Sequence, residues 1–564
     1  MAQASEKSWR RDTKAAAQDG EQSDDSSLLR RISLFVSRYP WIVCALLIGV
    51  SLLLDFYELG KPSIWFDEAF SVELARQPLP VLWRTIFGPE PNMELYYLML
   101  HFWLRLTAFM GLHPVEWVVR LPSAVCAALS TGVVFWLGRR YLGTIVAALA
   151  ALLYACNYLQ LIYAQQTRAY ALQLLLLSLA WFALLAGLQN DRGHKRWWCV
   201  YVLMTVLAIY AHLFSLLILF SQCVAVVGLF VLSPQWRALI RRRILVFVSC
   251  LVLIGLLSIP MFIESLHGAK TGWLPVPHLP ELLSLLTIIS GDNIRYLSVM
   301  IICILCGVLF VGIAVLLRQM SGLSRWASAH PRISHNFASL HDLWPFVWIM
   351  LCWLLLPVVL SYLVSQGSLR LFSTRYLMVI VPPFCLLAVL GVVVFRQKMV
   401  RIILSCVLLG SAILVVPHYY QNAQVEDWNT AVHWMLARYQ SGDGLVCYDN
   451  TVTQGCQIAV EYYLDAYPQG AHFAADSPGA FSWEKYSTNT PQEDPALALQ
   501  PAALSTFAHE HTRLFMITGR ISNSVGVANV KKTQQWLDQH YHFDAQITTS
   551  TVAIRLYTTH QVYK

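Results

Sequence analysis

An adjacent pair of carboxylates stands between aromatic residues early in the chain. The segment WFDEAFS holds them as Asp67 and Glu68. One carboxylate of such a pair can take a proton from an attacking hydroxyl within hydrogen-bond reach, while the other can hold the geometry of the site or accept a second hydrogen bond. The same pair can equally cap an interfacial helix, because carboxylates stabilise helix N-termini. The spacing favours neither interpretation, so Asp67 and Glu68 are both candidate catalytic residues.

Further acidic and polar residues follow on the same side of the first apolar run. The stretch PEPNMELYY contains Glu90, Asn92 and Glu94, and a later connecting loop contains His267. Carboxylate, amide and imidazole groups can all accept a hydrogen bond from a substrate hydroxyl. We therefore predict that these four residues are auxiliary or acceptor-binding residues of the site.

Basic residues recur beside the later apolar runs. Guanidinium forks bind phosphate oxygens in a bidentate way, although any single Arg or Lys can instead extend to ordinary lipid head groups. Together with the acidic pair, they indicate a site for an anionic lipid and a hydroxyl nucleophile. The candidates for binding the phosphate are Arg375, Arg168, Tyr376 and Lys270.

The composition decides which class of protein must position these side chains. Of 564 residues, 57% are apolar and 13% are charged, whereas a soluble protein carries about a quarter charged residues. These values exclude a soluble, a disordered and a disulfide-scaffold protein, and they indicate a chain that crosses a lipid bilayer several times. The net charge of +8 is therefore interpreted loop by loop, from the Lys and Arg in each connection, and it does not predict a nucleic-acid partner.

Motifs for nucleotide or metal chemistry are missing from the sequence. It contains no G-x-x-x-x-G-K-[ST], no G-x-G-x-x-G after a strand and no H-E-x-x-H, so nothing indicates nucleotide use. The external His and acidic residues could bind a divalent ion, but no ligand spacing stands out. We predict no metal ligands and no cofactor, and a divalent metal is left open.

Twelve apolar runs set the topology. Each is near the roughly 20 residues that cross a bilayer, but twelve spans would place the basic connections 139–140 and 192–196 outside, against the positive-inside rule. These connections fall inside if 94–112 is an interfacial helix with Glu94, His101 and Arg105 on one face. The alternative is a span with three buried polar residues. We predict eleven spans, with the N-terminus in the cytoplasm and the C-terminus outside: 40–58, 118–138, 143–159, 169–187, 198–212, 216–233, 244–262, 296–318, 343–365, 374–395 and 402–418.

Composition also divides the chain into three parts. Residues 1–38 are polar and predict a disordered cytoplasmic tail, and residues 39–418 are the transmembrane domain, with an external loop over 59–117. Residues 419–564 predict a small external α/β domain, with a helix over 428–440 and strands over 445–449, 513–518 and within 543–558. Its Cys447 and Cys456 either close a disulfide in an oxidising compartment or remain thiols.

Several of these segments occur in the order seen in one known group. The ordered set resembles the bacterial branch of the GT-C glycosyltransferases, which comprises the dolichyl-phosphate-mannose protein mannosyltransferase-like proteins and is related to the aminoarabinose–lipid A transferase. The resemblance covers about residues 40–440. Its motifs are WFDEAFS at 65–71, LYY at 95–97, RLPS at 120–123 leading to GRR at 138–140, QQTRAY at 165–170, RYL at 375–377 and EDW at 426–428.

The resemblance implies both a fold and an activity. The implied fold is an all-α polytopic membrane protein of the GT-C type, with about eleven transmembrane helices, membrane-parallel helices in the first external loop and the small C-terminal α/β domain. The implied activity is transfer of a sugar, with inversion, from a polyprenyl-phosphate donor to an acceptor protein, lipid or glycan, on the external face of a bacterial inner membrane. By motif position, Asp67 is carried over as the general base or acceptor-binding carboxylate, with Glu68 as its neighbour. Arg375 and Arg168 are carried over to the donor phosphate.

Two departures from the family pattern affect the site. The residues QT at 166–167 stand where relatives often have Glu-Ala, so no acid is available in that loop. The residues PNME at 91–94 replace the commoner Pro-Pro before LYY, which adds Glu94 as an extra acid and leaves the substrate open.

Two other classes of function fit a polytopic chain. A transporter or lipid flippase often shows inverted repeats and charges near the bilayer midplane, whereas this sequence shows no internal repeat and its candidate charges lie at one rim. A membrane anchor whose outer domain binds a partner leaves the acidic pair and the rim of Arg and Lys unexplained. Glycosyl transfer is therefore the preferred hypothesis.

Overall fold

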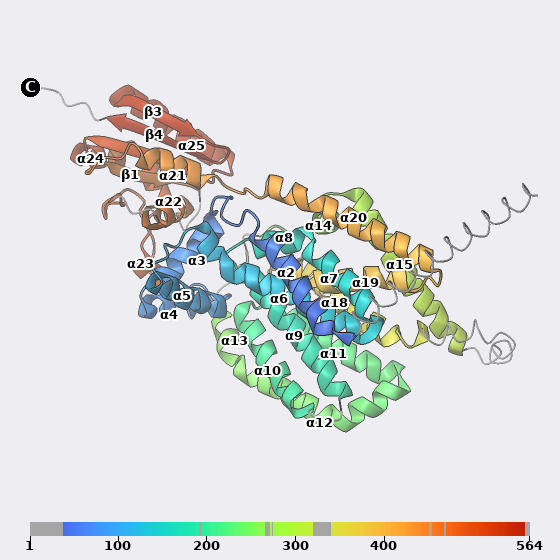
Figure 1. Cartoon of the computed structure of the whole chain (residues 1–564). Helices are drawn as coiled ribbons and strands as arrows, with labels where there is room; N and C mark the ends of the chain where they lie inside the picture. Colours follow the sequence, from blue (N-terminus) through green and yellow to red (C-terminus); the bar gives the residue numbers. More distant parts are fainter. Residues whose placement is uncertain are drawn as a thin grey trace, which may run out of the picture.

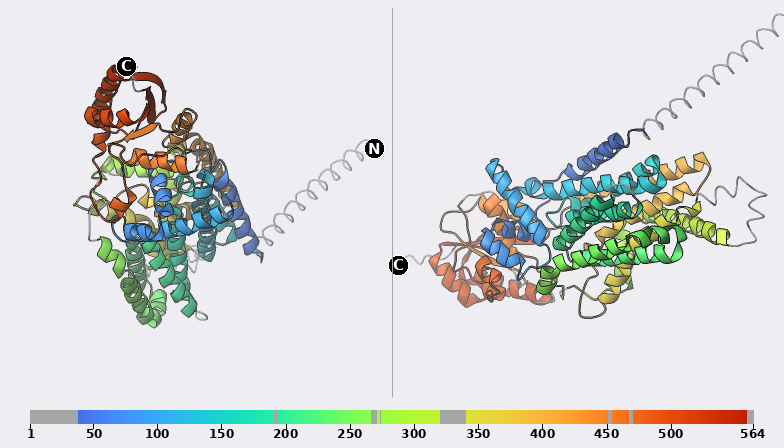
Figure 2. Two further views of the ribbon diagram at one scale, coloured as in Figure 1. Left: turned by 90° about the vertical axis from the view of Figure 1, so that its left-hand side faces the viewer. Right: turned by 90° about the horizontal axis from the view of Figure 1, so that it is seen from below.

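The structure is a computed structural model that describes residues 38–190, 194–265, 271–272, 274–319, 340–450, 454–466 and 470–558. A bundle of long helices makes up most of it, and a small domain with a β-sheet sits at one end (Figure 1). Helices from the first loop lie between the bundle and this domain, as further views confirm (Figure 2). Apart from Arg38, the predicted tail 1–38 lies outside the described residues.

The bundle is almost entirely helical. Its elements are α2 (Pro40–Phe56), α6 (Glu116–Leu142), α7 (Thr144–Ala155), α8 (Tyr158–Ala164), α9 (Tyr170–Gln189), α10 (His194–Ala211), α11 (Ser215–Leu232), α12 (Pro234–Leu257), α13 (Ile259–Ser265), α14 (Leu279–Ile289), α15 (Ile294–Gln319), α18 (Trp344–Val364), η1 (Tyr376–Ile380), α19 (Val381–Val393) and α20 (Lys398–Asn422).

All eleven predicted spans form helices in the structure. Within the described part of the chain, seven helices are long and apolar enough to cross a membrane: α6, α9, α11, α15, α18, η1 with α19, and α20. Helices α7 and α8 are bent by 61° and make an eighth if they form one span. Helix α8 starts anew after the bend because Asn157 caps it: the Asn157 side chain accepts hydrogen bonds from the N–H groups of Leu159 and Gln160. The other predicted spans correspond to α2, α10 and α12, so the count of eleven stays a prediction.

The first loop forms three helices, α3 (Phe66–Arg76), α4 (Leu79–Ile86) and α5 (Glu94–Phe109). The predicted helix over 94–112 is present as α5, but the face that carries Glu94, His101 and Arg105 is not exposed along its length as in the expected interfacial helix. Glu94 and His101 are buried and Arg105 is exposed. The i, i+7 spacing turns Glu94 and His101 inward, where the His101 Nδ1 lies 2.7 Å from the carbonyl oxygen of Ala75 in α3. The exposed side is instead apolar and carries Phe102, Leu106 and Phe109.

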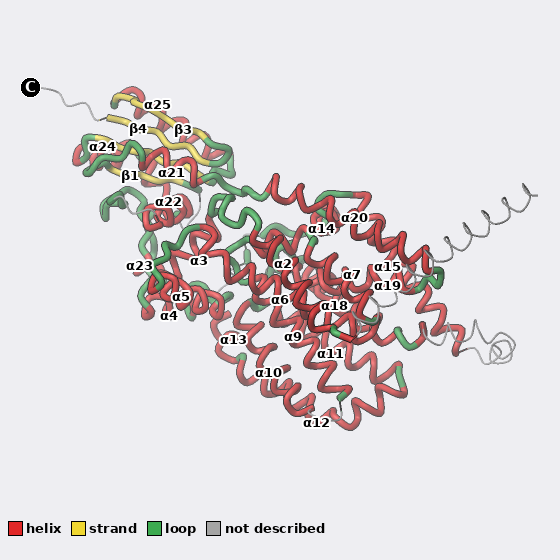
Figure 3. Tube along the Cα trace, in the orientation of Figure 1, coloured by secondary structure: helices red, strands yellow, loops and turns green. Residues whose placement is uncertain are grey.

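The C-terminal domain contains a four-stranded sheet, whose strands are yellow in Figure 3. Strand β1 (Gly444–Tyr448) pairs in parallel with β2 (Arg513–Gly519), and β4 (Val552–Thr558) pairs antiparallel with both β2 and β3 (His542–Thr548). The order is β1-β2-β4-β3, and the strands lie where the sequence predicted them. The helical elements are α21 (Trp428–Leu436), α22 (Gly455–Ala466), α23 (Trp483–Ser487), η2 (Pro495–Leu499), α24 (Pro501–Glu510) and α25 (Ser524–His540).

The two faces of the sheet belong to different apolar clusters. Side chains alternate along a strand, so Cys447 and Ile517 join one cluster with α21 and α22, whereas Val446 and Met516 join another with α24 and α25. The first cluster continues through α3 into the helix bundle. Cys447 also forms a disulfide with Cys456 at the start of α22, which resolves the alternative left open by the sequence. The domain and the first loop therefore share one core.

Candidate active site

Asp67 lies in the first turn of α3, next to two guanidinium groups. Its Oδ2 accepts a hydrogen bond from Arg375 Nη1 at 2.7 Å and lies 3.8 Å from Arg168 Nη2. The three side chains are 18%, 24% and 10% exposed, so the cluster is accessible but mostly enclosed. Such an arrangement places a carboxylate that can accept a proton beside two cations that can bind an anion.

Arg168 is held in place from the short loop between α8 and α9. Its Nη1 donates to the main-chain oxygen of Asp67 and to Ser71 Oγ, both at 3.1 Å. Burial alone would lower the pKa of Arg375, but Tyr170 and Asp67 nearby outweigh it, so the pKa of Arg375 lies above its ordinary value. The pKa of Arg168 is raised in the same way. Both cations therefore stay charged at any physiological pH.

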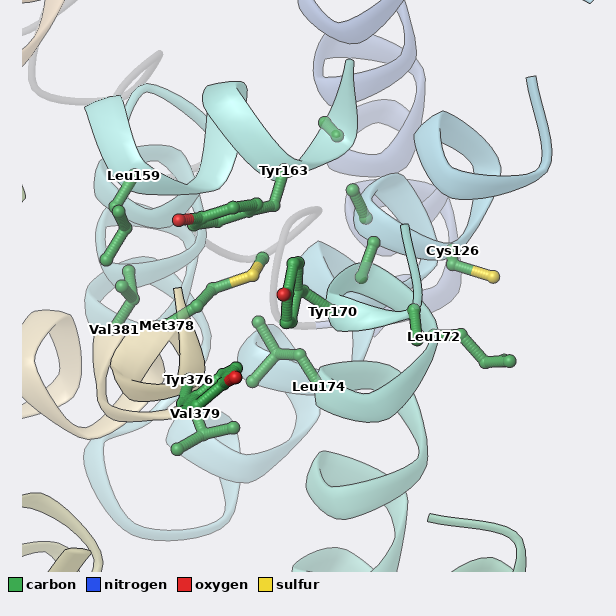
Figure 4. Packing of buried hydrophobic residues seen from close by; sticks show 14 of the residues in the cluster. Cys126, Leu159, Tyr163, Tyr170, Leu172, Leu174, Tyr376, Met378, Val379 and Val381 are labelled. Carbon is green, nitrogen blue, oxygen red and sulfur yellow. The ribbon is translucent and has the colours of Figure 1, made fainter. Parts of the chain in front are cut away.

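Aromatic rings form the wall behind the two arginines. Tyr170 packs against Tyr163 and Tyr376, with ring centroids 4.9 and 6.2 Å apart (Figure 4). Tyr376 in turn packs against His212, at 4.7 Å. The Arg168 guanidinium lies 5.9 Å from the Tyr170 ring. The predicted phosphate-binding residue Tyr376 is thus a buried ring that packs against Tyr170 and His212.

Glu68 has a different environment from its neighbour Asp67. It is fully buried, and its two carboxylate oxygens accept from Arg120 Nε at 2.9 Å and Arg120 Nη2 at 2.8 Å. The main-chain N–H of Thr167 donates to the same carboxylate at 2.7 Å. Arg120 also donates to main-chain oxygens of the segment that precedes α3. Glu68 therefore ties α3 to α6 and to the Arg168 loop, which is the geometry-holding role that the sequence left open for one of the pair.

The three residues predicted from PEPNMELYY lie around this cluster in different ways. Glu90 accepts a hydrogen bond at 2.5 Å from the hydroxyl of Tyr486 in the C-terminal domain. Asn92 Nδ2 lies 3.5 Å from His212 Nε2. Glu94 is fully buried, and no residue of the described chain forms a hydrogen bond to its carboxylate. Burial, with Glu90 and Glu264 nearby, raises the pKa of Glu94 to about 9, so this side chain is a neutral acid at pH 7.

The structure brings some of the predicted residues together and leaves others aside. Asp67 contacts both Arg168 and Arg375, and Tyr376 packs against Tyr170, the ring beside Arg168. His267 and Lys270 lie outside the described residues. In the parts of the chain that are described, no group of three or more His, Cys, Asp or Glu side chains is arranged to hold a metal ion.

Sequence reasoning did not identify three residues that shape the site. His212 ended a predicted span, and a polar residue at the end of an apolar run was its only signal. Arg120 belonged to a recurring motif, but nothing local connected it with Glu68. Tyr486 carried no signal, because its contact with Glu90 joins positions 396 apart in the chain.

Comparisons with known proteins agree with this architecture. The family model of the dolichyl-phosphate-mannose-protein mannosyltransferases matches residues 98–262. No curated protein sequence matches the chain. Among solved structures, the chain is similar to ArnT from Cupriavidus metallidurans in the apo state, with 12% identity and a TM-score of 0.55, over 92% of this chain and 98% of that one. It is similar to the same protein bound to undecaprenyl phosphate, with 11% identity, a TM-score of 0.53 and the same coverage. The predicted fold class is confirmed.

Proposed function

We propose that this chain, a multi-pass membrane glycosyltransferase of the GT-C type, transfers a sugar from a polyprenyl-phosphate donor to an acceptor hydroxyl on the external face of the membrane. The observation that carries the proposal is the contact of one accessible carboxylate, Asp67, with two guanidinium groups, Arg375 at 2.7 Å and Arg168 at 3.8 Å. ArnT bound to undecaprenyl phosphate, which has a similar fold, supports the donor class.

The proposed step is a single displacement. Asp67 takes the proton of the acceptor hydroxyl, the hydroxyl oxygen bonds to the anomeric carbon, and the bond from that carbon to the phosphate oxygen breaks. The bonding electrons leave with the polyprenyl phosphate, whose growing negative charge is stabilised by Arg375 and Arg168. The phosphate competes with Asp67 for these guanidiniums and so frees the carboxylate for the acceptor. Attack from the face opposite the leaving group inverts the anomeric centre.

The proposed orientation places the N-terminus in the cytoplasm of a bacterial cell and the C-terminal domain outside the inner membrane. Helix α6 supports it, because its two ends differ in charge and in partners. Glu116 in its first turn accepts a hydrogen bond from Asn429 of the C-terminal domain, whereas Arg139 and Arg140 lie in its last turn. A helix of 27 residues spans about 40 Å, so these arginines lie across the membrane from the domain, as the positive-inside rule favours.

A direct assay tests the proposal. Purified protein is incubated with a labelled polyprenyl-phosphate sugar, with and without candidate acceptors, and release of the lipid phosphate is followed. We expect release that depends on an acceptor. A transporter or flippase would move the lipid without cleaving it, and an anchor protein would do neither, so an intact donor in the presence of a range of acceptors would contradict the proposal.

A further inference from the structure

Phe66, the residue before Asp67, contacts two residues of the C-terminal domain. The main-chain N–H of Phe66, the first residue of α3, donates to Glu426 Oε2 at 3.0 Å. The guanidinium carbon of Arg520 lies over the Phe66 ring, 3.9 Å from its centroid. Both contacts join positions 360 or more residues apart in the chain. We call Glu426 and Arg520 together the Phe66 clamp.

Glu426 is fixed in the clamp by two hydrogen-bond donors and an ion pair. Besides the Phe66 N–H, its Oε2 accepts from the indole nitrogen of Trp428 at 2.7 Å, and its Oε1 lies 3.4 Å from Arg520 Nε. Both Glu426 and Trp428 belong to the EDW motif that opens the domain, and the proposed chemistry gives that motif no role. Through Glu426 this motif binds the first residue of α3, the helix that carries Asp67.

Arg520, whose side chain lies over Phe66, has an unfavourable backbone conformation. Its φ is +53°, in the left-handed region that non-glycine residues rarely adopt. Gly455 packs against the same pair, because a Cβ there would collide with Arg520 Nη1 and lie 2.9 Å from Phe66 Cδ2. The disulfide partner Cys456 follows Gly455 directly, and its N–H donates to Asp449 Oδ2 at 2.7 Å. The domain thus places both Arg520 and Gly455 against the Phe66 ring.

The segment leading to α3 is attached to the domain at two further points. The hydroxyl of Tyr463 accepts from the Ile64 N–H at 2.9 Å, and the Asn429 N–H donates to Ser63 Oγ at 3.0 Å. Together with the clamp, these contacts fix the backbone just before Asp67. On the other side of Asp67, Glu68 is fixed by Arg120.

We propose that Glu426 and Arg520 are positioning residues that set the reach of Asp67 toward the acceptor through the start of α3. This inference rests on the role of Asp67 in the proposed function. A displacement of about 1 Å at a reacting group can cost up to about 100-fold in rate, so a contact at the preceding residue is close enough to control kcat.

The chain offers a matched control arginine for the test. Arg555 lies in the same domain, is 23% exposed like Arg520, pairs with Asp538 at 3.3 Å and lies 5.4 Å from the Phe543 ring. We expect Arg520→Ala to lower kcat about tenfold with donor KM and thermal unfolding unchanged, and Arg520→Lys to restore part of the rate, because the ammonium keeps a cation over the ring. Arg555→Ala should leave kcat unchanged. An equal loss in Arg555→Ala, or no loss in Arg520→Ala, would overturn the inference.

A second readout does not depend on activity. Amide hydrogen exchange over residues 62–70 reports directly on the Phe66 N–H. We expect faster exchange there in Arg520→Ala and Glu426→Ala, and no change in Arg555→Ala. Unchanged exchange in the first two variants would overturn the positioning role even if their kcat falls. If wild-type protein fails to cleave any polyprenyl-phosphate sugar, the proposed function fails instead, and the exchange result still decides whether the clamp orders the start of α3.

Discussion

Asp67 and Glu68 are neighbours in one helical turn, and each carboxylate pairs with arginine, yet their surroundings differ. The Glu68–Arg120 pair is almost completely buried and bidentate, with 0% and 2% of the side chains exposed. The Asp67 cluster uses a single short contact to Arg375, a longer one to Arg168, and remains 18% exposed at the carboxylate. A closed pair with all its hydrogen bonds made is suited to hold elements together. An accessible carboxylate with spare acceptor capacity is suited to chemistry.

Breaking the closed pair should mainly affect folding. Removing one partner of a buried ion pair leaves an uncompensated charge and costs about 3–5 kcal/mol. We therefore expect Glu68→Ala to lower the thermal unfolding temperature of the detergent-solubilised protein strongly. Glu484→Ala, which breaks the exposed pair with Arg84, is the matched control and should change little. Equal effects of the two substitutions would show that Glu68 does not hold α3 in the way its contacts indicate.

Breaking the open cluster at its cation should mainly affect donor use. Loss of a preorganised charge at a developing anion costs about 100-fold or more in rate, so we expect Arg375→Ala to lower kcat/KM for the polyprenyl-phosphate sugar about 100-fold while the protein stays folded. Arg370→Ala serves as the control, because Arg370 donates to the main-chain oxygens of Ser365 and Gly367 instead. Unchanged dependence on donor concentration in Arg375→Ala would remove Arg375 from the phosphate site.

Glu94 is also buried, but among the described residues no Arg or Lys pairs with its carboxylate. Its pKa is raised to about 9, from about 4.3 in an unfolded chain. Between these values the unfolded state loses a proton that the folded state keeps, so Glu94 reduces the free energy of unfolding progressively as pH rises from about 4.3 to about 9.

Glu94→Gln removes this titration. The variant should therefore gain stability relative to wild type as pH rises from 5 to 8, by an amount on the order of 1 kcal/mol per unit of pH. Thermal unfolding of both proteins across this range measures the difference. A constant difference over the range would show that Glu94 is already ionised in the folded protein.

The sequence predicted local and compositional features better than contacts between distant segments. Hydropathy and the placing of Arg and Lys located the helices, and the motif order led to Asp67, Arg168 and Arg375. In the structure both guanidinium groups lie within 4 Å of the Asp67 carboxylate. At α5 the i, i+7 spacing showed that Glu94 and His101 share a helical face. It could not show whether that face points to the protein interior or to the surface, and the structure has it buried. The Glu68–Arg120 pair and the Phe66 clamp escaped prediction, since they join residues 52 or more apart and leave no periodic pattern.

The central claim is that Asp67 takes the proton of the acceptor. Single-turnover cleavage of a labelled polyprenyl-phosphate sugar, at saturating donor and acceptor, tests it most directly when wild type is compared with Asp67→Asn. We expect Asp67→Asn to bind the donor as wild type does but to release the lipid phosphate about 100- to 10,000-fold more slowly, the range that general bases contribute. Near-equal release by the two proteins would contradict it.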